Sequence, residues 1–154
     1  MYYAEREFID AVELIQSPLP LKTGCPKIVL PLAMENVAAG FPSPADDYID
    51  VGIDLNEQLI RHPISTFFLR VSGDSMTNAG IHHGDLLIVD RSLDPHPGNV
   101  VIAVLDGAFT LKRLQRYQGR LRLEAANPNY PHLELSLCNE IQIWGVAIHV
   151  IHHL

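Results

Sequence analysis

The sequence has few of the residues that stabilise small exported proteins or cross membranes. Its two cysteines, Cys25 and Cys138, are too sparse for a disulfide framework, and neither belongs to a C-x-x-C metal motif. No apolar run approaches the roughly 20 residues that span a bilayer. The first ten residues, MYYAEREFID, are acidic where a secretory signal would be basic and then apolar. These absences predict a soluble cytoplasmic protein with reduced, structural cysteines.

Basic residues are scarce as well. The chain has 11 Lys and Arg against 18 Asp and Glu, a formal net charge of −7. Because the phosphate backbone attracts clustered Lys and Arg, we expect no direct binding to nucleic acid. A protein partner could nevertheless itself be bound to DNA.

Proline, in contrast, is concentrated in the first third of the chain. Before it, apolar residues at spacings of four and three predict a short amphipathic helix over residues 4–16. Six prolines between Ser17 and Ala45 disfavour a regular helix or a central strand and predict an extended, accessible segment. With 154 residues the chain suffices for one compact domain with an arm. We assign residues 1–39 to the arm and 40–154 to the domain.

The rest of the chain has the pattern of a mainly β protein. A short helix is expected first, with Asp54 as its N-cap and its end at Arg61 before Pro63. Asp106 and Gly107 separate two apolar runs, and Asp-Gly is typical of a two-residue hairpin turn. The expected fold is an antiparallel sheet with one short helix and an extended, partly helical N-terminal arm. Six strands are predicted: Phe67–Val71, Leu86–Asp90, Val100–Leu105, Ala108–Leu114, Leu121–Ala125 and Ile141–Ile151.

A candidate nucleophile follows the first of these strands. The segment Gly73-Asp74-Ser75-Met76 joins the strand to a short polar stretch, so Ser75 is expected at a sharp bend. Backbone N–H groups at such a bend, here those of Asp74 and Ser75, can point together at a developing oxyanion. An isolated Gly-Asp-Ser is usually only a turn, and a serine also needs a base.

The candidate bases are four histidines and one lysine: His62, His82, His83, His96 and Lys112. A histidine base would need a carboxylate partner, and three are available, so composition leaves both chemistries open: Asp74, Asp85 and Asp90. Lys112 lies in an apolar run, with Arg113 on the other strand face. Burial without a counter-ion lowers the pKa of a lysine, and its neutral amine then becomes a base. The alternative is a surface lysine whose stem lies along the sheet.

Taken together, several ordered motifs resemble the LexA/UmuD family of self-cleaving Ser/Lys peptidases (peptidase S24). The likeness covers about three quarters of the chain, from Ala39 to the C-terminus, in the motifs AGFPSPADDYID, IDLNEQLIRHP, SGDSM, GDLLIVDRS, FTLKRL and WGVAIHV. The resemblance implies that Ser75 is the nucleophile, Lys112 its base and Ala39–Gly40 the scissile bond. It implies a cut that removes residues 1–39.

The resemblance is to the UmuD branch rather than to repressors. A repressor needs a helix-turn-helix domain, and residues 1–39 have only three basic residues and are rich in proline. The branch implies a protein of the DNA-damage (SOS) response, stimulated by a RecA filament on single-stranded DNA. The processed homodimer would be an accessory subunit of a Y-family, UmuC-like translesion polymerase. The arm is longer than usual, and Ala39 replaces a frequent cysteine. The alternative is a catalytically inactive, dimeric polymerase-binding module.

Two further predictions concern the C-terminal histidines and the last strand. His149, His152 and His153 lie together, but no carboxylate or cysteine accompanies them at ligand spacing, so no metal and no cofactor is expected. The apolar strand Ile141–Ile151 is a candidate for part of the subunit interface, and an ordinary core strand would have the same pattern. A signal-peptidase-like enzyme also uses Ser/Lys chemistry but would need a membrane anchor.

Overall fold

The computed structural model describes residues 18–20, 24, 26–33, 39–40, 49–135 and 141–154. The chain divides into a large unit, Met1–Leu21 with Ile64–Leu154, and a small unit, Lys22–Pro63. The helix predicted over residues 4–16 lies outside the described residues. No helix among the described residues is long and apolar enough to span a membrane.

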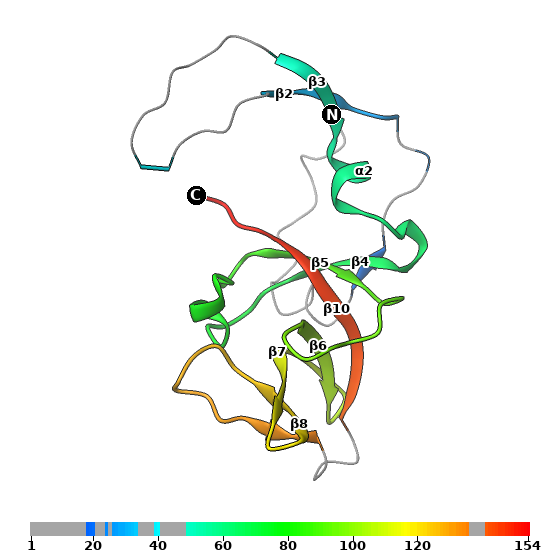
Figure 1. Ribbon diagram of the computed structural model, residues 1–154. Coiled ribbons are helices and arrows are strands. Elements are labelled where there is room, and N and C mark those ends of the chain that lie inside the picture. Colours follow the sequence, from blue (N-terminus) through cyan, green and yellow to red (C-terminus); the bar gives the residue numbers. More distant parts are fainter. Residues whose placement is uncertain (1–17, 21–23, 25, 34–38, 41–48, 136–140) are drawn as a thin grey trace, which may run out of the picture. The chain divides into compact units, whose positions relative to one another are not determined.

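In the described part of the small unit, a pair of strands is followed by a short helix (Figure 1). Strand β2 (Val29–Ala33) pairs antiparallel with β3 (Ile49–Asp54), and helix α2 (Leu55–Leu59) follows directly. Neither strand was predicted. Pro31 is tolerated in β2 because each strand of a two-stranded sheet has an unpaired edge. The predicted helix is confirmed: Oδ1 of Asp54 accepts hydrogen bonds from the N–H groups of Asn56 and Glu57, at 2.8 and 3.3 Å.

The large unit is a single antiparallel sheet, and the prediction of a mainly β fold is confirmed (Figure 1). The strand order is β1-β4-β5-β10-β6-β7-β8-β9. Two 3₁₀ turns accompany the sheet, η1 (Pro63–Ser65) before β4 and η2 (Thr77–Ala79) after it. The strands are β1 (Leu19–Pro20), β4 (Thr66–Arg70), β5 (Leu86–Asp90), β6 (Val100–Leu105), β7 (Ala108–Tyr117), β8 (Arg120–Glu124), β9 (Leu133–Glu134) and β10 (Gln142–Ile151).

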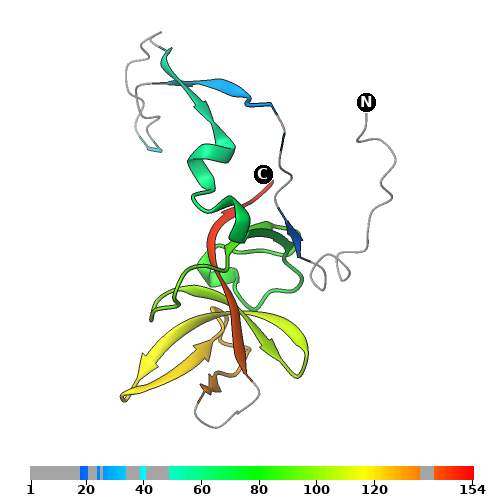
Figure 2. The same cartoon turned by 90° about the vertical axis from the view of Figure 1, so that its right-hand side faces the viewer.

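Strand β10 runs through the middle of the sheet, with β5 on one side and β6 on the other (Figure 2). Both of its backbone edges are therefore occupied within the chain. Its role in a subunit interface stays a prediction, and such a contact would use side chains rather than strand addition.

The Asp-Gly hairpin is also confirmed, and it sets the register of the strand that carries Lys112. Asp106 and Gly107 both have positive φ, 49° and 77°, as a turn of the I′ type requires. The turn joins β6 to β7, and Lys112 is thereby paired with Val101.

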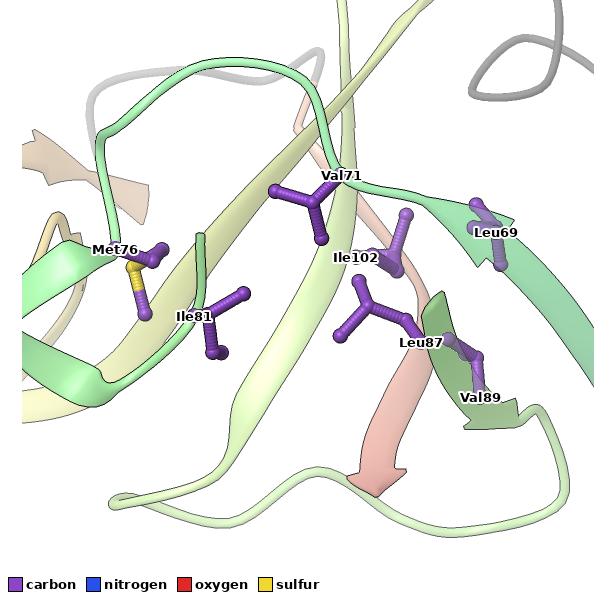
Figure 3. Close-up of a cluster of buried hydrophobic side chains, with 7 residues drawn as sticks. All are labelled: Leu69, Val71, Met76, Ile81, Leu87, Val89 and Ile102. Atoms are coloured by element: carbon purple, nitrogen blue, oxygen red, sulfur yellow. The ribbon is translucent and has the colours of Figure 1, made fainter. Parts of the chain in front are cut away.

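Two clusters of buried side chains form the core of the large unit. One contains Val101, Ala103, Leu114, Leu123 and Val146. The other lies between β4, β5, β6 and the segment after β4, as Figure 3 shows; its members are Leu69, Val71, Met76, Ile81, Leu87, Val89 and Ile102. Met76 is only 1% exposed although it follows Ser75 directly. Burying such a side chain stabilises the fold by roughly 1.5–3 kcal/mol, so the core itself fixes the backbone at Ser75.

Candidate active site

Ser75 lies in the loop that joins β4 to β5, which is closed at its base by two backbone hydrogen bonds. The N–H of Val71 donates to the carbonyl of Asp85 at 2.9 Å, and the N–H of Gly84 donates to the carbonyl of Val71 at 2.8 Å. At the far side of the loop, Met76 and Ile81 both point into the core (Figure 3). The loop is thus held both at its base and by its buried side chains.

Within this loop, Ser75 occupies the bend that the sequence predicted. The N–H of Thr77 donates to the carbonyl of Asp74 at 3.4 Å, which makes Ser75 the second residue of a tight turn. Gly73 has φ of +90°, a conformation that favours glycine and lets the chain leave the strand sharply. Because Met76 is buried, the partly exposed Ser75 faces the other way, toward β7.

Lys112 approaches Ser75 from the middle of β7. Its Nζ lies 3.5 Å from Oγ of Ser75, 3.1 Å from Oγ1 of Thr110 and 3.1 Å from the carbonyl oxygen of Leu111. Lys112 is 8% exposed, so the alternative of a surface lysine is wrong. None of the described carboxylates forms an ion pair with it.

The electrostatic setting of Lys112 favours its neutral form. Burial lowers the pKa of Lys112 below its ordinary value, because the ammonium loses hydration. Its neighbours are a hydroxyl and a carbonyl, which bring no formal negative charge to hold the proton. None of the hydrogen-bond partners of Lys112 is thus an ion-pair partner.

The histidines that sequence reasoning left as alternative bases lie elsewhere. Nδ1 of His83 accepts a hydrogen bond from the N–H of Gly73 at 3.2 Å, and His82 lies 3.8 Å from a carboxylate oxygen of Asp85. His96 lies 2.7 Å from the carbonyl oxygen of Asp94, and His62 belongs to the small unit. Among the described side chains, Lys112 alone is within hydrogen-bond distance of Oγ of Ser75.

A second loop, which follows β8, holds the turn that contains Ser75 by hydrogen bonds. The sequence did not predict this contact. The amide of Asn127 donates to the carbonyl of Asp74 at 2.9 Å, and the hydroxyl of Tyr130 donates to the carboxylate of Asp74. That hydrogen bond raises the pKa of Tyr130, so the hydroxyl keeps its proton as a donor. The ring of Tyr130 also faces Lys112, with 5.9 Å from Nζ to the ring centre.

Beside Ser75 lies a pocket whose apolar wall comes from four strands and from the loop between β4 and β5. The N–H groups of Asp74 and Ser75, expected to hold an oxyanion, donate to no other group in the described part of the chain. Ser75 is itself among the residues that line the pocket. The apolar lining consists of Leu69, Val71, Met76, Leu87, Ile102, Phe109 and Leu111.

The expected scissile residues, Ala39 and Gly40, lie in the small unit and are both exposed. A side chain added at Gly40 would meet nothing within 4 Å. Residues 34–38 and 41–48, which flank the bond, lie outside the described residues.

This arrangement of a serine turn and a buried lysine is accompanied by a family match that spans most of the chain. The chain belongs to the Peptidase S24-like family, whose model matches residues 31–148. This is a family of self-cleaving serine peptidases, and membership of it supports a peptidase.

Similar proteins indicate to which branch of the family the chain belongs. SamA of Salmonella typhimurium (strain LT2) is 49% identical over 122 residues, which cover 79% of this chain and 84% of SamA. ImpA of Escherichia coli is 46% identical over 130 residues, 84% of this chain and 88% of ImpA. The LexA repressor of Aliivibrio salmonicida is 36% identical over 140 residues, 90% of this chain and 64% of the repressor. The predicted resemblance is confirmed: this is a UmuD-type protein of the SOS response to DNA damage.

Proposed function

We propose that the chain cuts its own peptide bond between Ala39 and Gly40, with Ser75 as nucleophile and neutral Lys112 as general base. The observation that carries the proposal is the 3.5 Å separation of Nζ of Lys112 from Oγ of Ser75, combined with the burial of that lysine. Burial lowers the pKa of Lys112 and so increases the fraction of amine with a free lone pair at neutral pH.

The reaction would proceed through an acyl-enzyme. Oγ of Ser75 attacks the carbonyl carbon of Ala39 while Nζ of Lys112 takes the hydroxyl proton. The C–N bond then breaks, and Lys112 returns this proton to the departing amine of Gly40. A water molecule, deprotonated by Lys112, hydrolyses the ester and restores Ser75. The products are residues 1–39 and a chain of 154 − 39 = 115 residues.

Two features of the site support this course. The N–H groups of Asp74 and Ser75 offer donors to the oxyanion of the tetrahedral intermediate, and losing one such donor typically costs about 3–4 kcal/mol of transition-state stabilisation. The small side chains at Ala39 and Gly40 let the substrate backbone come close to Ser75. Because enzyme and substrate belong to one chain or one dimer, the effective concentration is high, and control would lie in docking.

The family supplies the setting for this reaction. We propose that a RecA filament on single-stranded DNA stimulates the cut by binding the docked conformation more tightly than the resting one. The processed chain would form a homodimer that serves as the accessory subunit of a UmuC-like, Y-family translesion polymerase. These partners follow from the likeness to the UmuD branch.

Intact mass spectrometry after incubation tests the proposal. The wild-type chain should yield a 115-residue product that begins at Gly40, and Ser75→Ala should yield none. Gly40→Glu should also block the cut, because a bulky charged side chain would enter a site shaped for backbone. A product from Ser75→Ala, or a new terminus other than Gly40, would reject the assignment, and a wild-type chain that stays intact even with the filament would favour the inactive module.

A further inference from the structure

A second group of chemically active side chains lies at the base of the serine loop. His82 and Asp85 belong to the end of the β4–β5 loop, and His152 directly follows β10. Because β5 and β10 are antiparallel and Ile151 is paired with Leu86, the residue before β5 and the residue after β10 become neighbours. The fold thus joins Asp85 to His152 across 67 positions of sequence.

The three side chains are already oriented toward one another. Nδ1 of His152 lies 2.6 Å from Oδ1 of Asp85, and Nδ1 of His82 lies 3.8 Å from Oδ2. The orientation of the Asp85 carboxylate is fixed by a hydrogen bond, in which the backbone N–H of His82 donates to Oδ2 at 2.8 Å. Asp85 is 3% exposed, whereas the side chains of His82 and His152 are 48% and 46% exposed. A buried acceptor is therefore flanked by two rings that solvent reaches.

The site offers one carboxylate oxygen and two imidazole nitrogens as possible metal ligands.

We propose that His82, Asp85 and His152 bind a Zn²⁺ ion, through Nδ1 of each histidine and one carboxylate oxygen, with the fourth position open to water. The three donor atoms lie within 4.8 Å of one another, and donors around a tetrahedral Zn²⁺ are about 3.4 Å apart. Small rotations of the two exposed rings bring them to that spacing. Two nitrogen donors favour Zn²⁺ over Mg²⁺ or Ca²⁺, which prefer oxygen. The ion replaces the proton between His152 and Asp85.

The position of the site suggests what the ion does there. Asp85 is the residue whose carbonyl accepts from Val71 at the base of the serine loop, and the neighbouring His83 accepts from Gly73. A bound ion would tie this base to the end of β10 and so brace the loop. The inference is independent of the proposed self-cleavage, since it concerns binding alone.

The test uses the full-length, untagged Ser75→Ala chain, which keeps the substrate bond intact. Isothermal titration with Zn²⁺ should give one site per chain, and Mg²⁺ should give none. His152→Gln and His82→Gln, both at exposed positions, should each weaken Zn²⁺ binding by at least about tenfold. Two matched controls, His149→Gln and His153→Gln, should leave the affinity unchanged.

Co²⁺ provides an independent readout, because a four-coordinate Co²⁺ ion absorbs strongly in the visible. The absorption should appear with one equivalent and be lost in His152→Gln. The proposal is overturned if the Ser75→Ala chain binds no Zn²⁺, if binding survives both His82→Gln and His152→Gln, or if His149→Gln and His153→Gln weaken it equally. The last result would locate the site in the C-terminal histidines instead.

Discussion

At the residue scale, Lys112 is a basic residue in a buried position that disfavours its charged form. Its aliphatic stem is enclosed by the sheet and its Nζ has three oxygen neighbours, none of them a carboxylate. Each unit by which burial lowers a pKa corresponds to about 1.4 kcal/mol. The burial that would make Lys112 a base in the proposed mechanism should therefore reduce the stability of the fold.

The loss of stability caused by burying Lys112 can be measured from the pH dependence of the free energy of unfolding. The pKa of Lys112 is lowered in the folded protein, so between the folded pKa and the unfolded value of about 10.4 the unfolded chain binds more protons. The penalty is present below the folded pKa and is lost as pH rises through that window.

We predict that Lys112→Met, in a Ser75→Ala background, raises the free energy of unfolding at neutral pH, because an apolar side chain needs no hydration. The gain over the parent should shrink as pH approaches about 10.4. Urea unfolding of both chains at several pH values measures it. A gain that does not change with pH would mean that Lys112 keeps its ordinary pKa in the folded state.

At the scale of elements, the serine loop depends on the loop that follows β8. Asn127 and Tyr130 hold the carbonyl and the carboxylate of Asp74, the residue before Ser75. Neither touches Oγ of Ser75, so we expect both to act by positioning it.

We predict that Tyr130→Phe slows self-cleavage several-fold, since it removes the hydroxyl but keeps the ring beside Lys112. A loss of about 1.4 kcal/mol would be tenfold in rate. Tyr117→Phe is the matched control, because that hydroxyl meets only Gln118. First-order rates, with circular dichroism to verify folding, give the comparison. Equal rates for Tyr130→Phe and wild type would show that the outer loop does not position the turn.

Features that depend on neighbouring residues in the sequence were predicted, whereas contacts between distant segments were not. The runs that became β5 and β6, and the Asp-Gly turn at 106–107, are local patterns, and they were predicted within a residue or two. The bond from Tyr130 to Asp74 spans 56 positions, and no local pattern encodes it. Asp85 likewise meets His152 only through strand pairing, so a search for carboxylates near the C-terminal histidines missed it.

At the scale of the whole molecule, the proposed cut involves both units and a protein partner. Ser75 belongs to the large unit and Ala39 to the small one, so the proposed cut would require the segment around Ala39, from the same chain or from a dimer mate, to dock at Ser75. With a net charge of −7, we expect the chain to be repelled by bare DNA, most strongly at low salt, where screening is weakest.

We therefore predict that single-stranded DNA alone neither binds the chain nor speeds its cleavage, whereas a preformed RecA filament does. The assay compares first-order rates with DNA, with RecA lacking DNA, and with the assembled filament. Acceleration by bare DNA would contradict the expected indirect role of nucleic acid.

The central claim, that Ser75 is activated by a neutral lysine, is tested most directly by the pH dependence of spontaneous cleavage. Formation of the 115-residue product is followed from about pH 6 to pH 10, with Ser75→Ala as the blank. We predict a rate that rises roughly tenfold per pH unit below the pKa of Lys112, flattens above it, and is abolished by Lys112→Arg, whose guanidinium stays protonated. A rate that levels off near the histidine pKa of about 6.5, persists in Lys112→Arg and is lost on replacing His83 would contradict the Ser75–Lys112 mechanism.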